Sequence, residues 1–146
     1  MKIPDANVLL YARNADSPQH TAASDWMEEA LSGHDPVGFP TAVLLAFIRI
    51  TTNAGVWDPP LTIDAACDQI QQWLAAKPAI RVDGGVEHLE LVRKLLTAAG
   101  RAGRLTSDAH LAAIAIERRA TLHSFDSDFD GFEGLDFKLL GSSAAG

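Results

Sequence analysis

The chain begins with MKIPDANVLLYARN (residues 1–14), a short apolar run that leads through a proline and an acid into a helix-like segment. Residues 1–4 predict a short strand, and residues 7–13 predict a short helix. Because proline cannot donate to a strand ladder, the strand should end at or before Pro4. Asp5 is therefore expected at the C-terminal end of a strand, where open parallel sheets bind their ligands.

Beyond this segment, short apolar runs that predict strands alternate with longer segments that predict helices. Further strands are expected at 37–39, 79–82, 121–125 and 137–140. The expected helices run from Ser17 and Pro18 to about Leu31, from Thr41 onward, from Thr62 to before Pro78, from Val86 to Ala99, and through Asp108 after a cap at Thr106 or Ser107. This alternation predicts an α/β fold, a three-layer sandwich in which helices flank a central parallel sheet of about five short strands.

The composition is typical of one soluble domain. Of the 146 residues, 47% are hydrophobic, the mean hydropathy is +0.04, and there is no long uncharged apolar run. We expect one domain at residues 1–140 and a flexible tail, GSSAAG, at 141–146. The N-terminus lacks the features of a signal peptide, so a cytoplasmic location without membrane association is expected.

Charge, cysteine and histidine usage exclude several other classes. A net charge of −7 argues against nucleic-acid binding through the overall field, so any such binding must be local. Cys67 is the only cysteine, which excludes an intrachain disulfide and a thiolate zinc site. The five histidines show no pair at zinc spacing. His110 follows Asp108 by two residues and is expected to point to a different side of the same helix, as a packing or surface residue.

Three acidic stretches carry the functional signal: PDANVLLYA around Asp5, SDAHLAA around Asp108, and SFDSDFDGF around Asp126 and Asp128. If the fold gathers these carboxylates, they can hold Mg²⁺ or Mn²⁺, because hard divalent cations prefer oxygen ligands. Such a site favours hydrolysis of phosphoesters, since the metal neutralises the phosphate and acidifies a water.

Each acid also has a plainer interpretation. Asp5 can be a cap, Asp108 can be stabilised by the N-terminal dipole of its helix, and DSDFDG matches the opening of a calcium loop. The calcium interpretation fails because the twelfth loop position, which needs a bidentate acid, is Phe137. A phosphatase that uses Asp5 as a nucleophile would need an acid partner that the sequence does not supply.

The matching segments DANVLLYA (5–12), FIRITT (47–52), GRLTSDAHLAAIAIERRATL (103–122) and SFDSDF (124–129) resemble the PIN-domain ribonucleases. Within them the chain resembles the VapC toxins of bacterial toxin–antitoxin pairs, particularly the mycobacterial set. The resemblance implies a PIN-like sandwich, an RNA substrate, a homodimer and a VapB-type antitoxin whose C-terminal segment enters the site. It also implies that Asp5, Asp108 and Asp126 are the catalytic metal ligands, with help from Asp128.

Further residues are assigned through the same resemblance or by position. Ser124 stands where the family often has Thr or Ser, and Asn7 lies close to Asp5, so both are expected to support the site. Arg101 and Arg104 are expected to bind RNA phosphates. One family Glu is missing near Ala46, and residues 36–57 contain no acid at all. The prediction is therefore a Mg²⁺-dependent endoribonuclease toxin, with Mn²⁺ as a second possible ion. The alternative is a catalytically weakened PIN-fold protein that binds RNA or antitoxin.

Overall fold

The computed structural model describes residues 1–141 as helices and strands in alternation. The strands are β1 (Lys2–Pro4), β2 (Val37–Pro40), β3 (Ala79–Val82), β4 (Thr121–Ser124) and β5 (Asp136–Leu139). The helices are α1 (Ala6–Arg13), α2 (His20–Ser32), α3 (Thr41–Thr51), α4 (Ile63–Leu74), α5 (His88–Ala99) and α6 (Leu105–Glu117), with a 3-10 helix η1 (Ser127–Gly131).

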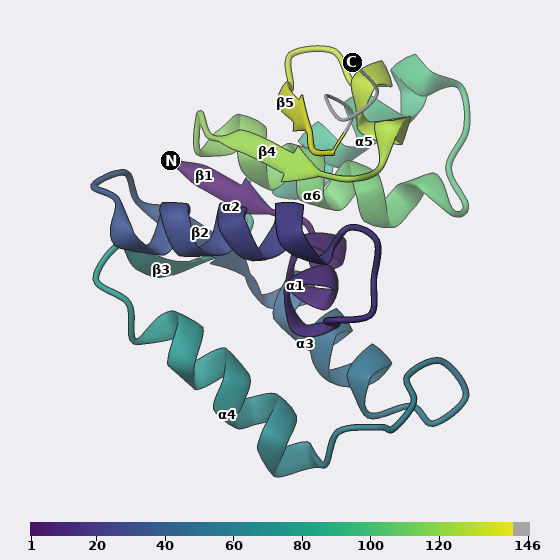
Figure 1. Ribbon diagram of the computed structural model, residues 1–146. Coiled ribbons are helices and arrows are strands. Elements are labelled where there is room, and N and C mark those ends of the chain that lie inside the picture. Colours follow the sequence, from purple (N-terminus) through teal and green to yellow (C-terminus); the bar gives the residue numbers. More distant parts are fainter. Residues whose placement is uncertain (142–146) are drawn as a thin grey trace.

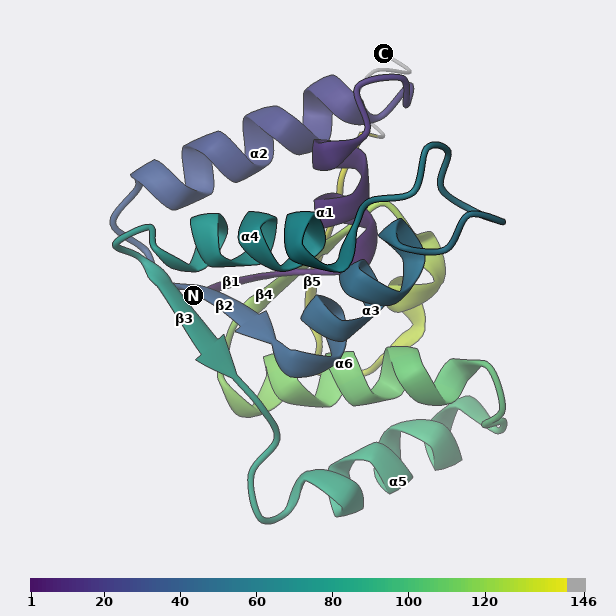
Figure 2. The same cartoon turned by 90° about the horizontal axis from the view of Figure 1, so that it is seen from below.

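All five strands pair in parallel in one sheet, in the order β3-β2-β1-β4-β5. Figures 1 and 2 show the three layers: α2 and α4 lie on one side of the strands, and α5 and α6 lie on the other. The predicted α/β sandwich with a central parallel sheet is therefore confirmed. β1 ends at Pro4 as expected, and the Asp5 N–H just after it donates to the His123 carbonyl of β4 at 2.9 Å.

The order of the strands creates a switch point between β1 and β4. From β1 the chain continues to β2 on one side, and from β4 it continues to β5 on the other. The carboxyl ends of β1 and β4 therefore border the crevice in which open α/β sheets bind ligands. Asp5 follows β1 directly, and Asp126 follows β4 after one intervening residue.

The core lies on both faces of the sheet. Ile3, Val37, Phe39 and Leu122 are fully buried in β1, β2 and β4. On the face covered by α6, the helix is buried along the run 111–115, which is rich in alanine. Such a helix has no solvated side over this stretch, so it lies close against the sheet and fixes the position of Asp108 in its first turn.

Three helix starts differ from the sequence prediction. α2 begins at His20, because Ser17 closes a separate turn by accepting a hydrogen bond from the Gln19 N–H at 3.1 Å. α5 begins at His88, two residues later than expected. Neither Thr106 nor Ser107 caps α6, which begins at Leu105 after a backbone turn in which the Leu105 N–H donates to the Ala102 carbonyl.

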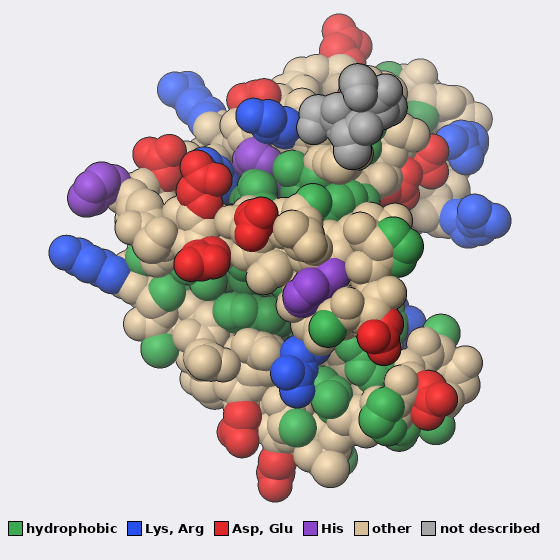
Figure 3. All heavy atoms as spheres, in the orientation of Figure 1, with side chains coloured by type: hydrophobic (Ala, Val, Ile, Leu, Met, Phe, Trp, Pro, Cys, Tyr) green, Lys and Arg blue, Asp and Glu red, His purple; other side chains and the backbone are tan. Residues whose placement is uncertain are grey.

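Two other expectations concern the ends of the chain and its environment. Of the predicted tail at 141–146, only Gly141 belongs to the described residues; 142–146 lie outside them. Over residues 1–141, none of the helices has the length and apolar character needed to cross a membrane. Figure 3 shows acidic and basic side chains interspersed over one face of the molecule.

Candidate metal centre

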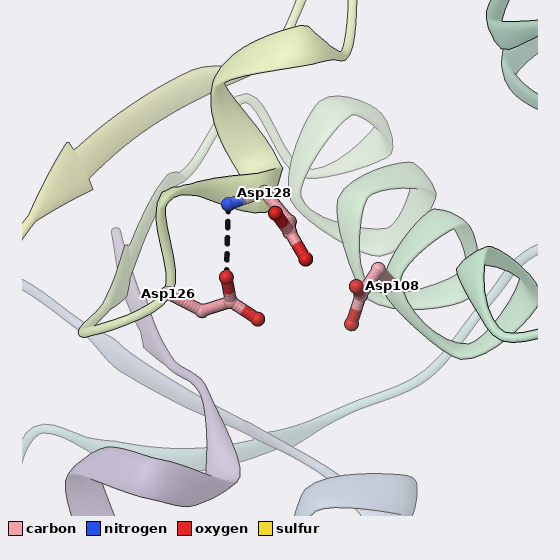
Figure 4. A group of neighbouring side chains, drawn as sticks. All are labelled: Asp108, Asp126 and Asp128. Atoms are coloured by element: carbon pink, nitrogen blue, oxygen red, sulfur yellow. Dashed lines mark hydrogen bonds between the residues drawn. The ribbon is translucent and has the colours of Figure 1, made fainter.

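Three of the predicted acids meet beyond the carboxyl end of β4. Asp108, Asp126 and Asp128 each present a carboxylate oxygen, and these atoms all lie within 4.8 Å of one another. Figure 4 shows the three side chains projecting into the space between η1 and the start of α6. Asp126 caps η1, since its Oδ1 accepts a hydrogen bond from the Asp128 N–H at 2.9 Å. This bond fixes how the two acids of the segment face Asp108.

Asp5 is not one of these three acids, and it is held by a hydrogen-bond network that joins β1 to β4. Its Oδ1 accepts from the Ala6 N–H at 2.7 Å, and its Oδ2 accepts from the Ser124 hydroxyl at 2.7 Å. The Ser124 oxygen in turn accepts from the Asp126 N–H and from the Asn7 amide, both at 3.0 Å. Ser124 is fully buried, so it serves as a fixed hub between the acids of the two strands.

The electrostatics of the site are those of gathered negative charges. Burial, and after it the charges of Asp5, Asp126 and Asp128, together raise the pKa of Asp108 from 3.8 to about 6. Burial also raises the pKa of Asp5, although the hydrogen bonds from Ser124 and Ala6 oppose the rise. A divalent cation would relieve this repulsion, and carboxylate oxygens are the ligands that Mg²⁺ and Mn²⁺ prefer. The residues present therefore fit such an ion.

The raised pKa of Asp108 predicts how the stability of the metal-free protein depends on pH. Between about pH 4 and pH 6 the folded state binds more protons than the unfolded state, so stability falls as the pH rises through this window. Mg²⁺ competes with the proton for the same carboxylates, so it should stabilise the protein more at about pH 7.5 than at about pH 5. Thermal melting in EDTA and in Mg²⁺ at both pH values measures this. If Mg²⁺ raised the melting temperature equally at the two pH values, Asp108 would not be a group that binds either a proton or the metal.

Arg101 and Arg104 lie in the connection between α5 and α6, beside the gathered acids. Together with Asp108, Asp126 and Asp128 they line a small pocket of about 140 Å³. Within residues 1–141 neither arginine forms an ion pair with these acids. Both guanidinium groups are thus available beside the acids, which is the position expected of groups that bind a substrate phosphate.

A larger cleft of about 440 Å³ opens on the other side of the acids, and Ala46 lines it together with Asp5 and Asp108. The position where the resemblance implies a fourth acid therefore faces the site, but it carries a methyl group. Arg49 and His110 line the same cleft. His110 was expected to be a packing or surface residue on a different side of the helix from Asp108. Its ring packs against that of His88 in α5, and the cleft is wide enough to be lined by both His110 and Asp108. Arg49 was missed, although it lies one helical turn after Ala46.

Comparison with known proteins gives a consistent result. The sequence model of the PIN domain family matches residues 2–135. The chain is 48% identical to Ribonuclease VapC37 of Mycobacterium tuberculosis over 135 residues, which cover 92% of this chain and 94% of that protein. It is 38% identical to Ribonuclease VapC33 of the same species, again over 92% of this chain and 94% of the relative.

Solved structures show the same fold at lower identity. VapBC2 from Rickettsia felis, bound to a promoter DNA fragment, aligns with a TM-score of 0.70 at 15% identity and covers 95% of this chain and 98% of that one. VapC20 of Mycobacterium tuberculosis, a toxin that cleaves the sarcin–ricin loop, aligns with a TM-score of 0.65 at 17% identity and covers 93% and 99%.

Proposed function

The chain belongs to the PIN-domain family and, within it, to the VapC ribonucleases, and on this basis we propose that it is an endoribonuclease that hydrolyses RNA phosphodiester bonds with Mg²⁺ or Mn²⁺. The observation that carries the proposal is the meeting of Asp108, Asp126 and Asp128 at the switch point of the sheet. The relatives at 48% and 38% identity are named ribonucleases, which supports the reaction class.

The residues divide the work by position. Asp108, Asp126 and Asp128 would hold the cation, and Asp5 would complete the negative site from its place beside Ser124. When bound, Mg²⁺ or Mn²⁺ supplies charge neutralisation at the phosphate and a more acidic water. Ser124, supported by Asn7, keeps Asp5 and the Asp126 backbone in register.

Arg101 and Arg104 have a complementary role in this proposal. They border the pocket of the acids, so their guanidinium groups would bind phosphates that flank the cleaved bond. This local positive charge lets a chain of net charge −7 approach RNA.

The biological role that the comparisons support is that of a toxin. The structural neighbours include VapBC assemblies, so we propose that this chain is the toxin of such a pair, acts in the cytoplasm, forms a homodimer and is inhibited by a VapB-type antitoxin. The alternative, a catalytically weakened binding protein, rests on Ala46 alone. It is not favoured, because relatives over 92% of the chain are named ribonucleases.

Incubation of RNA with the purified protein tests the proposal. We expect cleavage in Mg²⁺ or Mn²⁺, no cleavage in EDTA, and a loss of at least about tenfold in Asp5→Asn, because positioning groups around a metal contribute about 10- to 100-fold. Asn keeps an oxygen that can accept the Ala6 N–H, so the local fold should persist. The matched control is Asp25→Asn, an exposed acid of α2, which should cleave like wild type. Equal cleavage by wild type and Asp5→Asn would show that the assignment of Asp5 is wrong.

A further inference from the structure

The cleft beside the metal centre has a chemical character that the acids do not explain. Asp5 and Asp108 form one end of it, but most of its surface is apolar. The apolar walls are formed by Ala42, Val43 and Ala46 of α3, Leu89 and Val92 of α5, and Leu111 of α6. Leu89 is 81% exposed, so an apolar side chain faces water where the cleft opens. A volume of about 440 Å³ lies within the range of about 300–1,000 Å³ typical of small-ligand sites.

One polar group in the cleft is fixed by a chain of contacts that leads away from it. The His88 Nε2 and the His110 Nδ1 lie 2.7 Å apart, with the two rings nearly perpendicular. The His88 Nδ1 lies 3.4 Å from the Glu117 carboxylate. His88 is only 8% exposed, and a Cβ at Gly84 would overlap its ring, so the imidazole has little freedom to rotate.

These contacts determine which nitrogen of His110 is free. The nearby carboxylate of Glu117 favours the hydrogen of neutral His88 on Nδ1, which leaves its Nε2 as an acceptor. With this tautomer, the His110 Nδ1–H is the donor of the 2.7 Å contact to the His88 Nε2. The Nε2 of His110 is then an acceptor without a hydrogen, and it is the remaining hydrogen-bonding atom of a side chain that lines the cleft.

We infer that this cleft is a subsite for a nucleobase of the RNA substrate next to the cleaved phosphate, and that the His110 Nε2 accepts a hydrogen bond from the amino group of that base. The inference rests on the proposed function and adds a specificity-determining residue to it. Adenine, cytosine and guanine carry an exocyclic amino group that can donate, whereas uracil has none. The apolar walls suit the faces of a base, and the small side chain of Ala46 leaves room for it.

Charge and position favour a nucleotide over other occupants. Arg49 lines the cleft, is exposed and has no ion-pair partner among residues 1–141. A guanidinium group binds phosphate well, and every nucleotide in a strand is flanked by phosphates. Because Asp5 and Asp108 belong to both the cleft and the acidic site, an occupant of the cleft lies beside the reacting phosphate.

The test is to digest total bacterial RNA in Mg²⁺ or Mn²⁺ and to sequence the 5′ ends of the products. The sites cleaved by the wild-type protein should share, at one position next to the cut, a base that carries an amino group. His110→Ala should lower this preference about three- to tenfold, the effect of losing one hydrogen bond between neutral groups. His110→Gln keeps an acceptor and should restore part of the preference. Ala46→Leu should fill the cleft, slow cleavage and reduce the preference.

Two matched variants and three outcomes make the result decisive. His34→Ala and Leu45→Ala change exposed residues outside the cleft and should cleave like wild type. If wild type cleaves but the His110 and Ala46 variants keep its base preference and rate, the subsite is wrong while the proposed function stands. If these variants cleave normally but escape inhibition by the co-expressed antitoxin, the cleft binds protein and the inference is also wrong. If wild type leaves RNA intact, the proposed function fails, and the subsite fails with it.

Discussion

Asp108→Asn is expected to lower the rate of RNA cleavage by more than about 100-fold, because removal of a metal ligand should exceed the 10- to 100-fold cost of removing a group that only orients one. The same substitution should raise the thermal stability of the metal-free protein near neutral pH. Burial of the Asp108 carboxyl, followed by repulsion from the charges of Asp5, Asp126 and Asp128, raises its pKa to about 6. A neutral amide at this position removes that repulsion. Cleavage and thermal melting of the same preparations measure both effects.

Asp130→Asn is the matched control for this substitution. Asp130 belongs to the same 3-10 helix as Asp128 but is exposed and lies outside the group of gathered oxygens. We expect it to change neither the rate nor the metal-free stability appreciably. If Asp108→Asn cleaved RNA at the wild-type rate, or if it were less stable than wild type in EDTA, the assignment of Asp108 to the metal centre would be wrong.

Phe47→Ala is expected to have the largest effect on stability, about 3–5 kcal/mol. Phe47 is fully buried in α3, and its ring meets that of Trp73 in α4 edge to face, with 5.1 Å between centroids. Truncation removes this contact and leaves a cavity between the two helices. Urea unfolding measures the change. Leu45 belongs to the same helix but is 59% exposed, so Leu45→Ala should lower the free energy of unfolding by less than about 1 kcal/mol. Similar losses for the two variants would mean that α3 does not pack as described.

Much of the fold could be predicted because the relevant signals are local. Apolar runs of three or four residues locate the strands, and the strand at 79–82 agrees residue for residue. Thr62 caps α4 through its hydroxyl, and Gly100 ends α5 in the left-handed conformation, both as expected. The start of α6 was missed because a backbone turn replaces the expected side-chain cap, and a local pattern does not distinguish the two.

The sequence allowed us to predict that the carboxylates of the candidate metal centre would gather, but not the geometry in which they do so. Residues that follow strands are brought to one edge by parallel pairing, which is why Asp5 and Asp126 could be identified. The sequence could not show that Asp5 is placed differently from Asp126, because the position of Asp5 depends on a hydrogen bond from Ser124, 119 residues away. Asp128 was expected only to assist, yet the turn of η1 brings its carboxylate oxygen into the group formed with Asp108 and Asp126.

The missing acid near Ala46 changes meaning in the structure. From the sequence it was a gap that suggested weakened metal binding. In the fold, Ala46 is part of an apolar wall that adjoins the acids and is completed by Leu89 and Val92 from a helix some 40 residues later in the chain. Pairing of such distant apolar residues leaves no local trace, which is why the cleft could not be predicted.

Metal-dependent hydrolysis by the gathered carboxylates is tested most directly by the chemistry of the RNA ends. We expect products with 5′-phosphate and 3′-hydroxyl ends that form in Mg²⁺ or Mn²⁺ and do not form in EDTA. These ends are expected because the nucleophile that attacks the phosphate is water and not the 2′-hydroxyl of the RNA itself. Mass spectrometry of the products identifies the ends. Products that carry a 2′,3′-cyclic phosphate, or that form equally well in EDTA, would contradict the role assigned to Asp108, Asp126 and Asp128.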